Sequence, residues 1–434
     1  MPADEVTPST HESRPAESWQ RYLVAVACFV ASVLLLLVLA LRREPSDAVI
    51  EGASMAPTFL GEHWEVTCSE CQFRWPRGES VTQSSLGAIC PNCAERLSNP
   101  QQQRVAADRV RIDSLRYHRQ PPRRWDVVAI RRGGDWTVKR IVGLPGEEVC
   151  LRDGNVLVNG ERCDFDLTTW RSQAVVVHDD RFRNPRAKVT SLRWNITSLQ
   201  AGWSETLSGY RLTPAAQDAL AELHYVHQRY VFGPQPQPQA ASVLDDDHYN
   251  TGPARELNEV GDLALRLTIK PQNCSELQLS LHDGHNWNEA RWTHAAQAWQ
   301  LRQSDIVLAS HSTEGELSAC ELEFIIRDGQ LLLAVNRQPL LTAVLPASSQ
   351  ENRSGVDTPA RIAGRGEIEL NNIQLLRDIV YLSPQQTTNL WQAPRRLNAD
   401  EYFVLGDNSP VSVDSRNWAE FCVERRAING VVSK

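Results

Sequence analysis

The sequence predicts a mainly β protein with a single membrane helix near its N-terminus. Residues 22–41 are apolar and contain no charge, Gly or Pro. Several later segments alternate apolar and polar residues with the period of two that is typical of strands. Two Cys-x-x-Cys pairs, at 68–71 and 90–93, interrupt the predicted strands and mark a small insert.

The apolar segment 22–41 has the length of a membrane span. With a rise of ~1.5 Å per residue, about 20 helical residues cross a ~30 Å hydrocarbon core. The residues after it are not the small ones of a signal-peptide cleavage site, which favours a retained anchor over a cleaved signal. The flanking charges leave orientation open, because Arg14 and Arg21 balance Arg42 and Arg43.

The overall composition excludes some partners. The net charge is -8 and the pI near 5.8, and there is no polybasic run beyond short pairs. We therefore expect no nucleic-acid partner. Ten cysteines are too few for a disulfide-dense scaffold of this length. About 390 residues follow the span, enough for two or three folded units.

The first segment of chemical interest surrounds Ser54. Gly52 and Ala53 precede it, and Pro57 follows. Small residues let a backbone approach a substrate closely, and proline fixes the direction in which the loop leaves. An ordinary turn above the membrane has the same composition. The following residues 63–67 alternate like a strand.

The second such segment carries Lys139 in a largely apolar strand, 136–143. A lysine in such a strand is usually a surface residue whose stem packs while its ammonium stays in water. Burial would instead disfavour the charged form and lower its pKa. A neutral lysine can accept the proton of a serine hydroxyl, which is otherwise a weak nucleophile.

Four segments in order, after a membrane span, together resemble the signature boxes of type I signal peptidases. They are SMAPT at 54–58, DVVAI at 126–130, KRIVGLPG at 139–146 and GDNSPVSVDSR at 406–416. The resemblance covers roughly residues 20–67, 120–163 and 398–434. It implies a β-rich catalytic domain with a Ser–Lys dyad on the outer face of the membrane.

The resemblance assigns a role to each matching residue. It makes Ser54 the nucleophile and Lys139 the general base, a known variant of the serine-protease triad. Met55 is expected to line the apolar surface beside the site, and Ser412 to hydrogen-bond the lysine amine. Some relatives carry a hydroxyl two residues before the nucleophile, where this chain has Gly52. The oxyanion is then expected to rest mainly on backbone N–H groups, including that of Ser54.

The remaining matching residues are expected to support the site. Arg140 follows the general base on its strand. The resemblance implies that Asp407 and Asn408 brace the turn of the last box. It also implies that Asp414 and Arg416 form a salt bridge that shapes this loop. No cofactor is expected to take part in catalysis.

The cysteine insert predicts a structural metal site. Its four ligands are Cys68, Cys71, Cys90 and Cys93, in the spacing of a zinc ribbon. Four thiolates satisfy tetrahedral zinc and leave no open position, so the metal would stabilise and not catalyse. Two disulfides are the alternative in an exported, oxidising space, and a redox dithiol is a further one. The remaining cysteines give no clear pairing, although Cys150 and Cys163 flank a predicted hairpin.

The long stretch 164–397 departs from the signal-peptidase pattern. A helix is predicted from Thr213 to Tyr230, followed by a Pro-Gln linker at 233–239. Alternating strands then predict an antiparallel sandwich. They cover 263–269, 277–281, 322–326, 331–335 and 367–376.

The hairpin 321–335 in this stretch faintly resembles the centre of a concanavalin- or laminin-G-like jelly roll. Sandwiches of that kind often bind glycans, and Trp287, Trp292 and Trp299 are candidates for stacking on sugars. Tryptophans in a sandwich more often fill its core, which is the interpretation we prefer. A glycan or a protein is thus the candidate ligand of this insertion.

These observations predict a membrane-bound serine endopeptidase that removes signal peptides from exported preproteins. It is expected to be a single-pass protein of the plasma (inner) membrane, in contact with lipid, with an extracytoplasmic catalytic domain. The rivals are a degenerate, membrane-tethered glycan or protein receptor and a self-cleaving repressor-type protein. The predicted parts are a tail at 1–21, a span at 22–41, catalytic segments at 42–67, 124–163 and 398–434, a cysteine insert at 68–123 and an inserted domain at 164–397.

Overall fold

The computed structural model describes most of the chain, and the N-terminal apolar segment in it is helical. The described residues are 16–41, 46–78, 88–152, 154–183, 193–196, 202–214, 220–234, 236–250, 257–346, 355–381 and 394–434. Helix α1, Ala16–Leu41, contains the predicted span. Within the part of the chain that is described, no helix has the length and hydropathy needed to cross a membrane. The predicted membrane crossing is therefore not confirmed, and Arg14, Arg42 and Arg43 lie outside the described residues.

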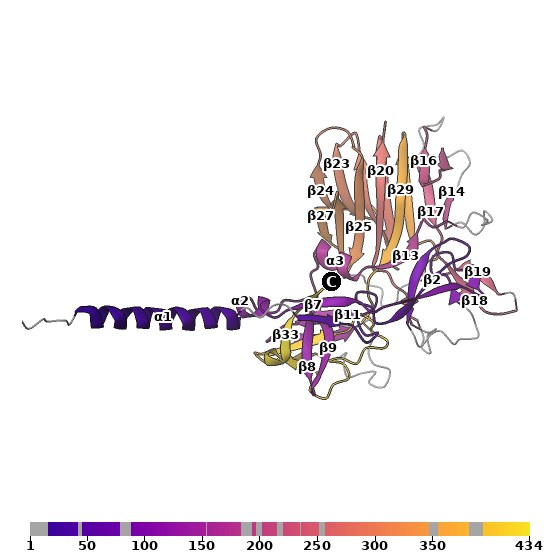
Figure 1. Cartoon of the computed structure of the whole chain (residues 1–434). Helices are drawn as coiled ribbons and strands as arrows, with labels where there is room; N and C mark the ends of the chain where they lie inside the picture. The colour runs from indigo at the N-terminus through magenta and orange to yellow at the C-terminus, as the bar shows by residue number, and fades with distance from the viewer. Residues whose placement is uncertain are drawn as a thin grey trace, which may run out of the picture.

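A seven-stranded antiparallel sheet contains strands from the segments that the sequence predicts to be catalytic, and we call it and its surroundings the catalytic part of the molecule (Figure 1). In spatial order its strands are β1 (Ser46–Val49), β7 (Arg109–Asp113), β33 (Ile428–Ser433), β8 (Val127–Arg132), β9 (Asp135–Gly143), β31 (Glu401–Leu405) and β32 (Val423–Glu424). Strands from three distant parts of the sequence thus lie side by side. Strand β7 comes from the stretch 68–123 that the sequence assigns to the cysteine insert, and the other six strands come from the predicted catalytic segments.

A smaller sheet extends this part of the molecule. Its order is β12 (Glu161–Arg162), β11 (Asn155–Val158), β10 (Glu148–Arg152) and β30 (Arg395–Arg396). The hairpin of β10 and β11 is the predicted one, although Asp153 of its turn lies outside the described residues. Cys150 and Cys163 are both buried free thiols and do not form a disulfide.

The cysteine insert is a small β unit attached to the catalytic part. Three strands form its sheet, in the order β3 (Arg74–Gly78), β2 (His63–Thr67) and β6 (Gln101–Val105), and β4 (Ala88–Ile89) pairs with β5 (Arg96–Leu97). Helix α2 (Arg116–Arg119) comes after β7. A core of Val66, Trp75, Leu97 and the cysteines holds the insert together.

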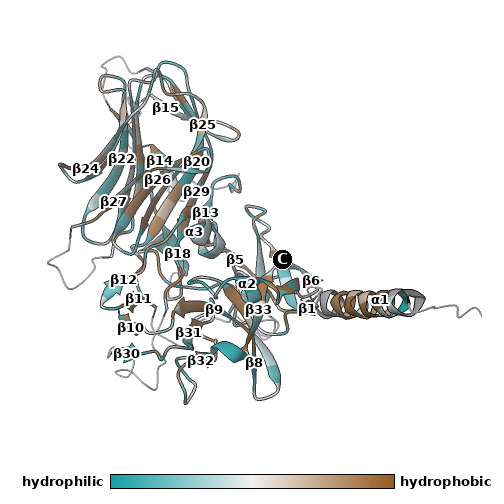
Figure 2. Cartoon of the chain, turned by 90° about the vertical axis from the view of Figure 1, so that its left-hand side faces the viewer, coloured by the Kyte–Doolittle hydropathy of each residue, from teal (hydrophilic) through white to brown (hydrophobic). Residues whose placement is uncertain are grey.

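Two antiparallel sheets of the inserted stretch pack face to face, as the sequence predicts for a sandwich. The first contains β15 (Trp203–Glu205), β16 (Gly209–Leu212), β29 (Ile368–Arg377), β20 (Leu263–Pro271), β25 (Cys320–Arg327), β26 (Gln330–Val335), β27 (Gln338–Val344) and, against β29, β13 (Val175–Asp179). The second contains β14 (Trp194–Ile196), β17 (Ala221–Tyr225), β28 (Ala360–Arg365), β21 (Glu276–His282), β22 (Trp287–Thr293), β23 (Ala298–Gln303) and β24 (Ile306–Ser312). Helix α3 (Leu167–Gln173) lies at the end of the sandwich nearest the catalytic sheet, as both views show (Figures 1 and 2).

The sandwich core explains two of its tryptophans. Trp292 and Trp299 are buried between the sheets, so the preferred interpretation as core residues is confirmed for both. Trp287 is different, because alternation along β22 places it on the other face. There the Arg361 guanidinium lies 3.9 Å from the centre of its ring. This half-buried ring is therefore not part of the core.

The predicted helix from Thr213 to Tyr230 is wrong. Among the described residues, this stretch contains strand β17 and most of β18 (Gln228–Val231), and residues 215–219 lie outside them. The predicted linker likewise contains part of β19 (Gln237–Ala240), which pairs with β18. The apolar spacing of Leu223 and Tyr225 also fits a strand, and pairing with β28 selects that alternative.

Candidate active site

Ser54 and Lys139 lie within hydrogen-bonding distance of each other beside strand β9. Ser54 lies in a turn after β1, where the Ala56 N–H donates to the Ala53 carbonyl and the Phe59 N–H to that of Met55. Lys139 lies on β9 opposite Val128. The Lys139 Nζ atom donates a hydrogen bond of 2.8 Å to Ser54 Oγ. The structure thus brings together the two residues that the sequence selects as nucleophile and base.

The environment of Lys139 favours its neutral form. The side chain is 2% exposed. Burial lowers its pKa from 10.5 to about 8, and the positive charge of Arg416 acts in the same direction. Asp414 and Asp407 act against this shift and do not cancel it. A substantial fraction of this amine is therefore unprotonated at mildly alkaline pH, as a general base requires.

Arg140, the next residue on β9, is held by a buried carboxylate. Its Nε and Nη2 atoms donate to the two oxygens of Asp407 at 2.8 and 2.6 Å. Burial alone would lower the pKa of Arg140, but Asp407 raises it overall. Thr58 also donates to Asp407, and its hydroxyl lies 3.3 Å from the Ser172 carbonyl of α3. This network ties the serine loop to the last box and to the inserted domain.

Asn408 links the nucleophile loop to the inserted stretch. Its N–H donates to the Ser54 carbonyl at 3.0 Å, and its Nδ2 atom donates to the Ala53 carbonyl at 3.0 Å. Its side-chain amide also exchanges hydrogen bonds with that of Asn250, at 2.7 and 2.9 Å. Asn408 therefore braces the Ser54 turn and not only its own loop.

Asp414 and Arg416 form the ion pair that the resemblance implies. Arg416 Nε and Nη2 donate to the two Asp414 oxygens at 2.8 and 2.6 Å. The same carboxylate accepts the Gly406 N–H at 2.9 Å. Arg416 also donates to the Ser409 carbonyl. Both ends of the 406–416 loop are thus attached to one carboxylate.

Ser412 does not make the predicted hydrogen bond to Lys139. Its Oγ atom is buried and has no hydrogen-bond partner among the described residues. The hydroxyl lies against Gly406, where an added Cβ would come within 2.2 Å of it and within 2.5 Å of the Ser54 carbonyl. The close approach of the two loops therefore requires glycine at 406. The lysine amine is oriented by Ser54 instead.

Two further expectations concern Met55 and Gly52. Met55 is 1% exposed and packs with Ile50, Phe59 and Val110 beneath the loop. It belongs to the core and not to an exposed apolar surface. A Cβ added at Gly52 would meet nothing within 4 Å, so there is room for a side chain at that position.

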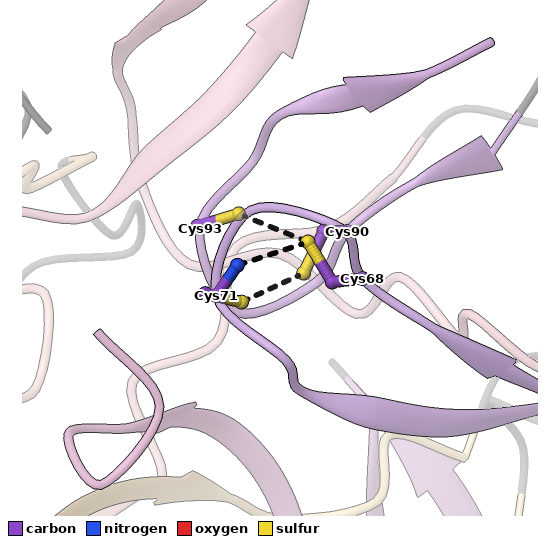
Figure 3. Close-up of side chains that lie close together, drawn as sticks. All are labelled: Cys68, Cys71, Cys90 and Cys93. Carbon is purple, nitrogen blue, oxygen red and sulfur yellow. Dashed lines mark hydrogen bonds between the residues drawn. The ribbon is translucent and has the colours of Figure 1, made fainter. Parts of the chain in front are cut away.

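The four cysteines of the insert converge on one point (Figure 3). Their sulfur atoms all lie within 4.8 Å of one another, with 3.7 Å between Cys68 and Cys93 and 3.6 Å between Cys71 and Cys90. Tetrahedral zinc with Zn–S bonds of about 2.3 Å requires S–S separations of about 3.8 Å. None of the four is in a disulfide. The cluster is therefore compatible with a bound metal, and the disulfide alternative does not fit this geometry.

Each cysteine pair lies in a turn of the same form. The Gln72 N–H donates to the Cys68 carbonyl, and the Ala94 N–H to the Cys90 carbonyl. Gln72 and Ala94 both adopt a positive φ, of 63° and 60°. The Glu70 N–H also points at Cys68 Sγ, at 3.4 Å. Such N–H groups stabilise a negatively charged sulfur, as a thiolate ligand needs.

Sequence reasoning assigned no role to three residues of this site. Thr58 and Gly406 lie within the matched boxes, and this position in the sequence could have identified them as residues of the site. Asn250 was not detectable, because it comes from the inserted stretch and reaches Asn408 only in the folded chain. Ile379 and Tyr381, also within 164–397, pack against Val149 of the catalytic part.

The sequence of this chain matches a known protein family. A family model described as signal peptidase, peptidase S26, matches residues 87–202 and 328–434, which is more than half of the chain. The matched ranges contain Lys139, Asp407 and Asp414 and begin after Ser54.

Two curated relatives match a shorter segment. A signal peptidase I of Leptolyngbya laminosa is 36% identical over 64 residues, which is 12% of this chain and 32% of that protein. A probable signal peptidase I-2 of Synechocystis sp. is 37% identical over 65 residues, covering 13% of this chain and 30% of that protein. The match thus spans about a third of the length of either relative.

Among solved structures, the carbohydrate-binding module CBM66 of Bacillus subtilis is similar over 42% of this chain and 95% of its own, with 9% identity and a TM-score of 0.28. A Bacillus subtilis protein with a galectin-like fold is similar over 47% of this chain and 99% of its own, with 10% identity and a TM-score of 0.29. At such TM-scores the similarity supports no statement about this chain.

Proposed function

This chain belongs to the signal peptidase family S26, and from that premise we propose that it is a serine endopeptidase that removes signal peptides from exported preproteins. Ser54 is the nucleophile in this proposal and Lys139 the general base. The carrying observation is the 2.8 Å hydrogen bond between Lys139 Nζ and Ser54 Oγ at a buried amine. The family supplies the substrate class, which is a preprotein with an N-terminal signal peptide.

The proposed reaction follows from these two groups. Neutral Lys139 accepts the Ser54 proton as the Oγ atom attacks the scissile carbonyl. The resulting ammonium then donates this proton to the amine of the leaving segment, which is the new N-terminus of the mature protein. In the second half, water attacks the acyl carbonyl while Lys139 takes its proton, and the lysine then returns this proton to Ser54 Oγ as the acyl–oxygen bond breaks. The cycle returns both side chains to their starting states.

The supporting residues hold this geometry and do not react. Asn408 accounts for two hydrogen bonds to the Ser54 turn, and the Asp414–Arg416 pair holds the 406–416 loop against it. In this proposal the oxyanion is stabilised mainly by hydrogen bonds from backbone N–H groups, including that of Ser54, because Gly52 offers no side-chain donor. A single oxyanion donor in other serine proteases contributes ~2.7–4 kcal/mol.

The direct test uses the full chain in detergent and a radiolabelled preprotein. We expect the purified protein to shorten the preprotein at one position after small residues, and Ser54→Ala to abolish this cleavage. The matched control is Ser310→Ala, since Ser310 is an exposed serine on β24 of the inserted sandwich and lies outside the nucleophile loop. Cleavage that persists in Ser54→Ala would refute the assignment of the nucleophile.

We further propose that α1 anchors the protein in the plasma (inner) membrane, with the catalytic domain outside the cytoplasm. Large apolar side chains of this helix, such as Trp19 and Phe29, are 70% exposed, and a helix that is apolar on all sides requires an apolar environment. Alkaline extraction of membranes tests this. An anchored chain stays in the membrane pellet, and a peripheral one is released into the supernatant.

For the cysteine insert we propose one structural zinc ion, held by Cys68, Cys71, Cys90 and Cys93. The residues fit, since four sulfur atoms lie at tetrahedral spacing and four thiolates leave no open position for catalysis. We expect elemental analysis to give about one zinc per chain. Cys90→Ser should lower the zinc content, whereas Cys150→Ser, at a buried thiol outside the cluster, should not.

A further inference from the structure

A cleft lies between the cysteine insert and the inserted domain, beside the catalytic loop. Its volume is about 770 Å³, within the range of roughly 300–1,000 Å³ typical of ligand sites. Trp75, Ile89 and Pro91 of the insert line one wall, and Val177 and Phe232 of the inserted domain line the other. Figure 1 shows β13 and β18 on the side of the sandwich that faces the insert.

The two walls are fixed relative to each other. The Gly78 N–H at the end of β3 donates to the Tyr249 carbonyl at 2.8 Å. Asn92, between the second pair of cysteines, accepts from the Asp179 N–H at 2.7 Å and donates to the Phe182 carbonyl at 2.7 Å. Because both contacts join the insert to the inserted domain, the cleft is preformed. A ligand therefore needs little reorganisation to bind there.

One end of the cleft reaches the catalytic machinery. Asn250 lines the cleft and exchanges two side-chain hydrogen bonds with Asn408. The Asn408 N–H in turn donates to the carbonyl of Ser54. The cleft therefore ends beside the loop that carries Ser54.

Most residues of the lining are uncharged, which favours a largely uncharged, extended chain, and the charged ones are Arg77, Arg229, Arg377, Asp246 and Asp247. Two of its charged groups pair with each other, since Arg229 donates to the Asp246 carboxylate at 2.9 Å. Val231 and Phe232 are 40% and 52% exposed although both line the cleft. Strand β13 pairs only with β29 among the described strands. A strand edge of this kind accepts main-chain hydrogen bonds from an added peptide strand.

We propose that this cleft binds the first residues of the mature protein, which follow the bond cut at Ser54, as an extended strand. The proposal rests on the function proposed above. The apolar region of a signal peptide stays in the bilayer, so the segment after the cleavage site is the part of the substrate that enters water. The insert and the inserted domain thus form an extended substrate site on the leaving-group side.

A binding measurement tests this without requiring cleavage. The Ser54→Ala protein in detergent is titrated with two fluorescein-labelled peptides that share one A-x-A cleavage site. The short peptide ends two residues after the site, and the long one ends twelve residues after it, adding about 33 Å of extended chain. We expect the long peptide to bind about tenfold more tightly, an effect typical of added strand pairing with side-chain contacts.

Two further variants of Ser54→Ala identify where the long peptide binds. Val231→Asp places a carboxylate on the cleft wall and should remove the preference for the long peptide. Val307→Asp is the matched control, because Val307 is 45% exposed, lies on β24 and does not line the cleft. It should keep the preference in full.

Two results would overturn the proposal. The first is equal affinity for the two peptides, and the second is an undiminished preference for the long peptide in Val231→Asp. Cleavage by the wild-type protein separates this from the proposed function. If it cuts the short peptide but the long one binds no better, the cleft proposal fails alone. If it cuts neither while the long peptide binds through Val231, the proposed function fails alone.

Discussion

Strand β9 places two cations in two different environments. Lys139 and Arg140 are neighbours, and each is 2% exposed. Arg140 meets the Asp407 carboxylate through two hydrogen bonds, and this pairing raises its pKa. Lys139 meets a neutral hydroxyl, and burial lowers its pKa to about 8. The position of one carboxylate decides which cation supports the structure and which one can act as a base.

The largest expected effect comes from exchanging the type of cation at the lysine position. Lys139→Arg should reduce kcat/KM by about a thousandfold or more, because a guanidinium stays protonated and cannot accept the serine proton. Lys270→Arg is the control, since Lys270 is exposed on the sandwich. Cleavage of a labelled preprotein measures both. Activity in Lys139→Arg comparable to wild type would remove lysine from the role of base.

Removal of the carboxylate that pairs with Arg140 should lower the stability of the protein. Asp407→Ala leaves a buried guanidinium without its partner, which costs about 3–5 kcal/mol. The double variant Asp407→Ala/Arg140→Met should recover part of this loss, because it also removes the uncompensated charge. Denaturant unfolding followed by tryptophan fluorescence measures both. A single variant as stable as wild type would show that the ion pair is not needed.

Removal of the Lys139 amine should change stability in the opposite direction, because burial penalises this charge and no carboxylate of the described residues is hydrogen-bonded to it. The unfolded chain holds the Lys139 proton up to a pKa near 10.5, whereas the native state releases it near 8. The unfolded state therefore binds more protons in this window, and stability rises with pH from about 8 to 10.5. Lys139→Met should flatten this rise and stabilise the protein at pH 7, on the order of 1–3 kcal/mol. Destabilisation at pH 7 would contradict a burial penalty on the lysine.

The smallest expected effect is a rise in kcat when a hydroxyl is added at position 52, near the expected oxyanion. Gly52→Ser adds a hydroxyl where nothing lies within 4 Å of the new Cβ. If the hydroxyl reaches the developing oxyanion, kcat should rise by up to about tenfold. Gly52→Ala is the control, because it adds the Cβ without a donor. Equal kcat for the two variants would show that backbone donors already satisfy this oxygen.

The parts of the site that were predictable share a local signal. The Ser54, Lys139 and Asp414 boxes are short segments with a specific order, and the cysteine pairs have a diagnostic spacing. Strand alternation also identified β20, β21, β25, β26 and β29. In each case neighbours in sequence carried the information.

The parts that were not predictable depend on tertiary contacts. Asn250 reaches Asn408 only because the inserted domain packs beside the catalytic loop. The Ser412 hydroxyl lies against Gly406 and has no hydrogen-bond partner among the described residues, which no sequence pattern encodes. The segment 213–230 has apolar spacing that fits a helix or a strand, and pairing with β28 and β19 selected strands.

The central claim, that Lys139 is poised to be neutral, is tested most directly by its own titration. The chain contains only four lysines, so a protein labelled with ¹³C-lysine gives few NMR signals, and the one absent from Lys139→Arg belongs to Lys139. We predict that this signal titrates near pH 8 and that kcat/KM of the wild type rises with pH through the same midpoint. A Lys139 titration above about pH 10, the range of an ordinary lysine, or a kcat/KM that falls as pH rises through 8, would contradict the account.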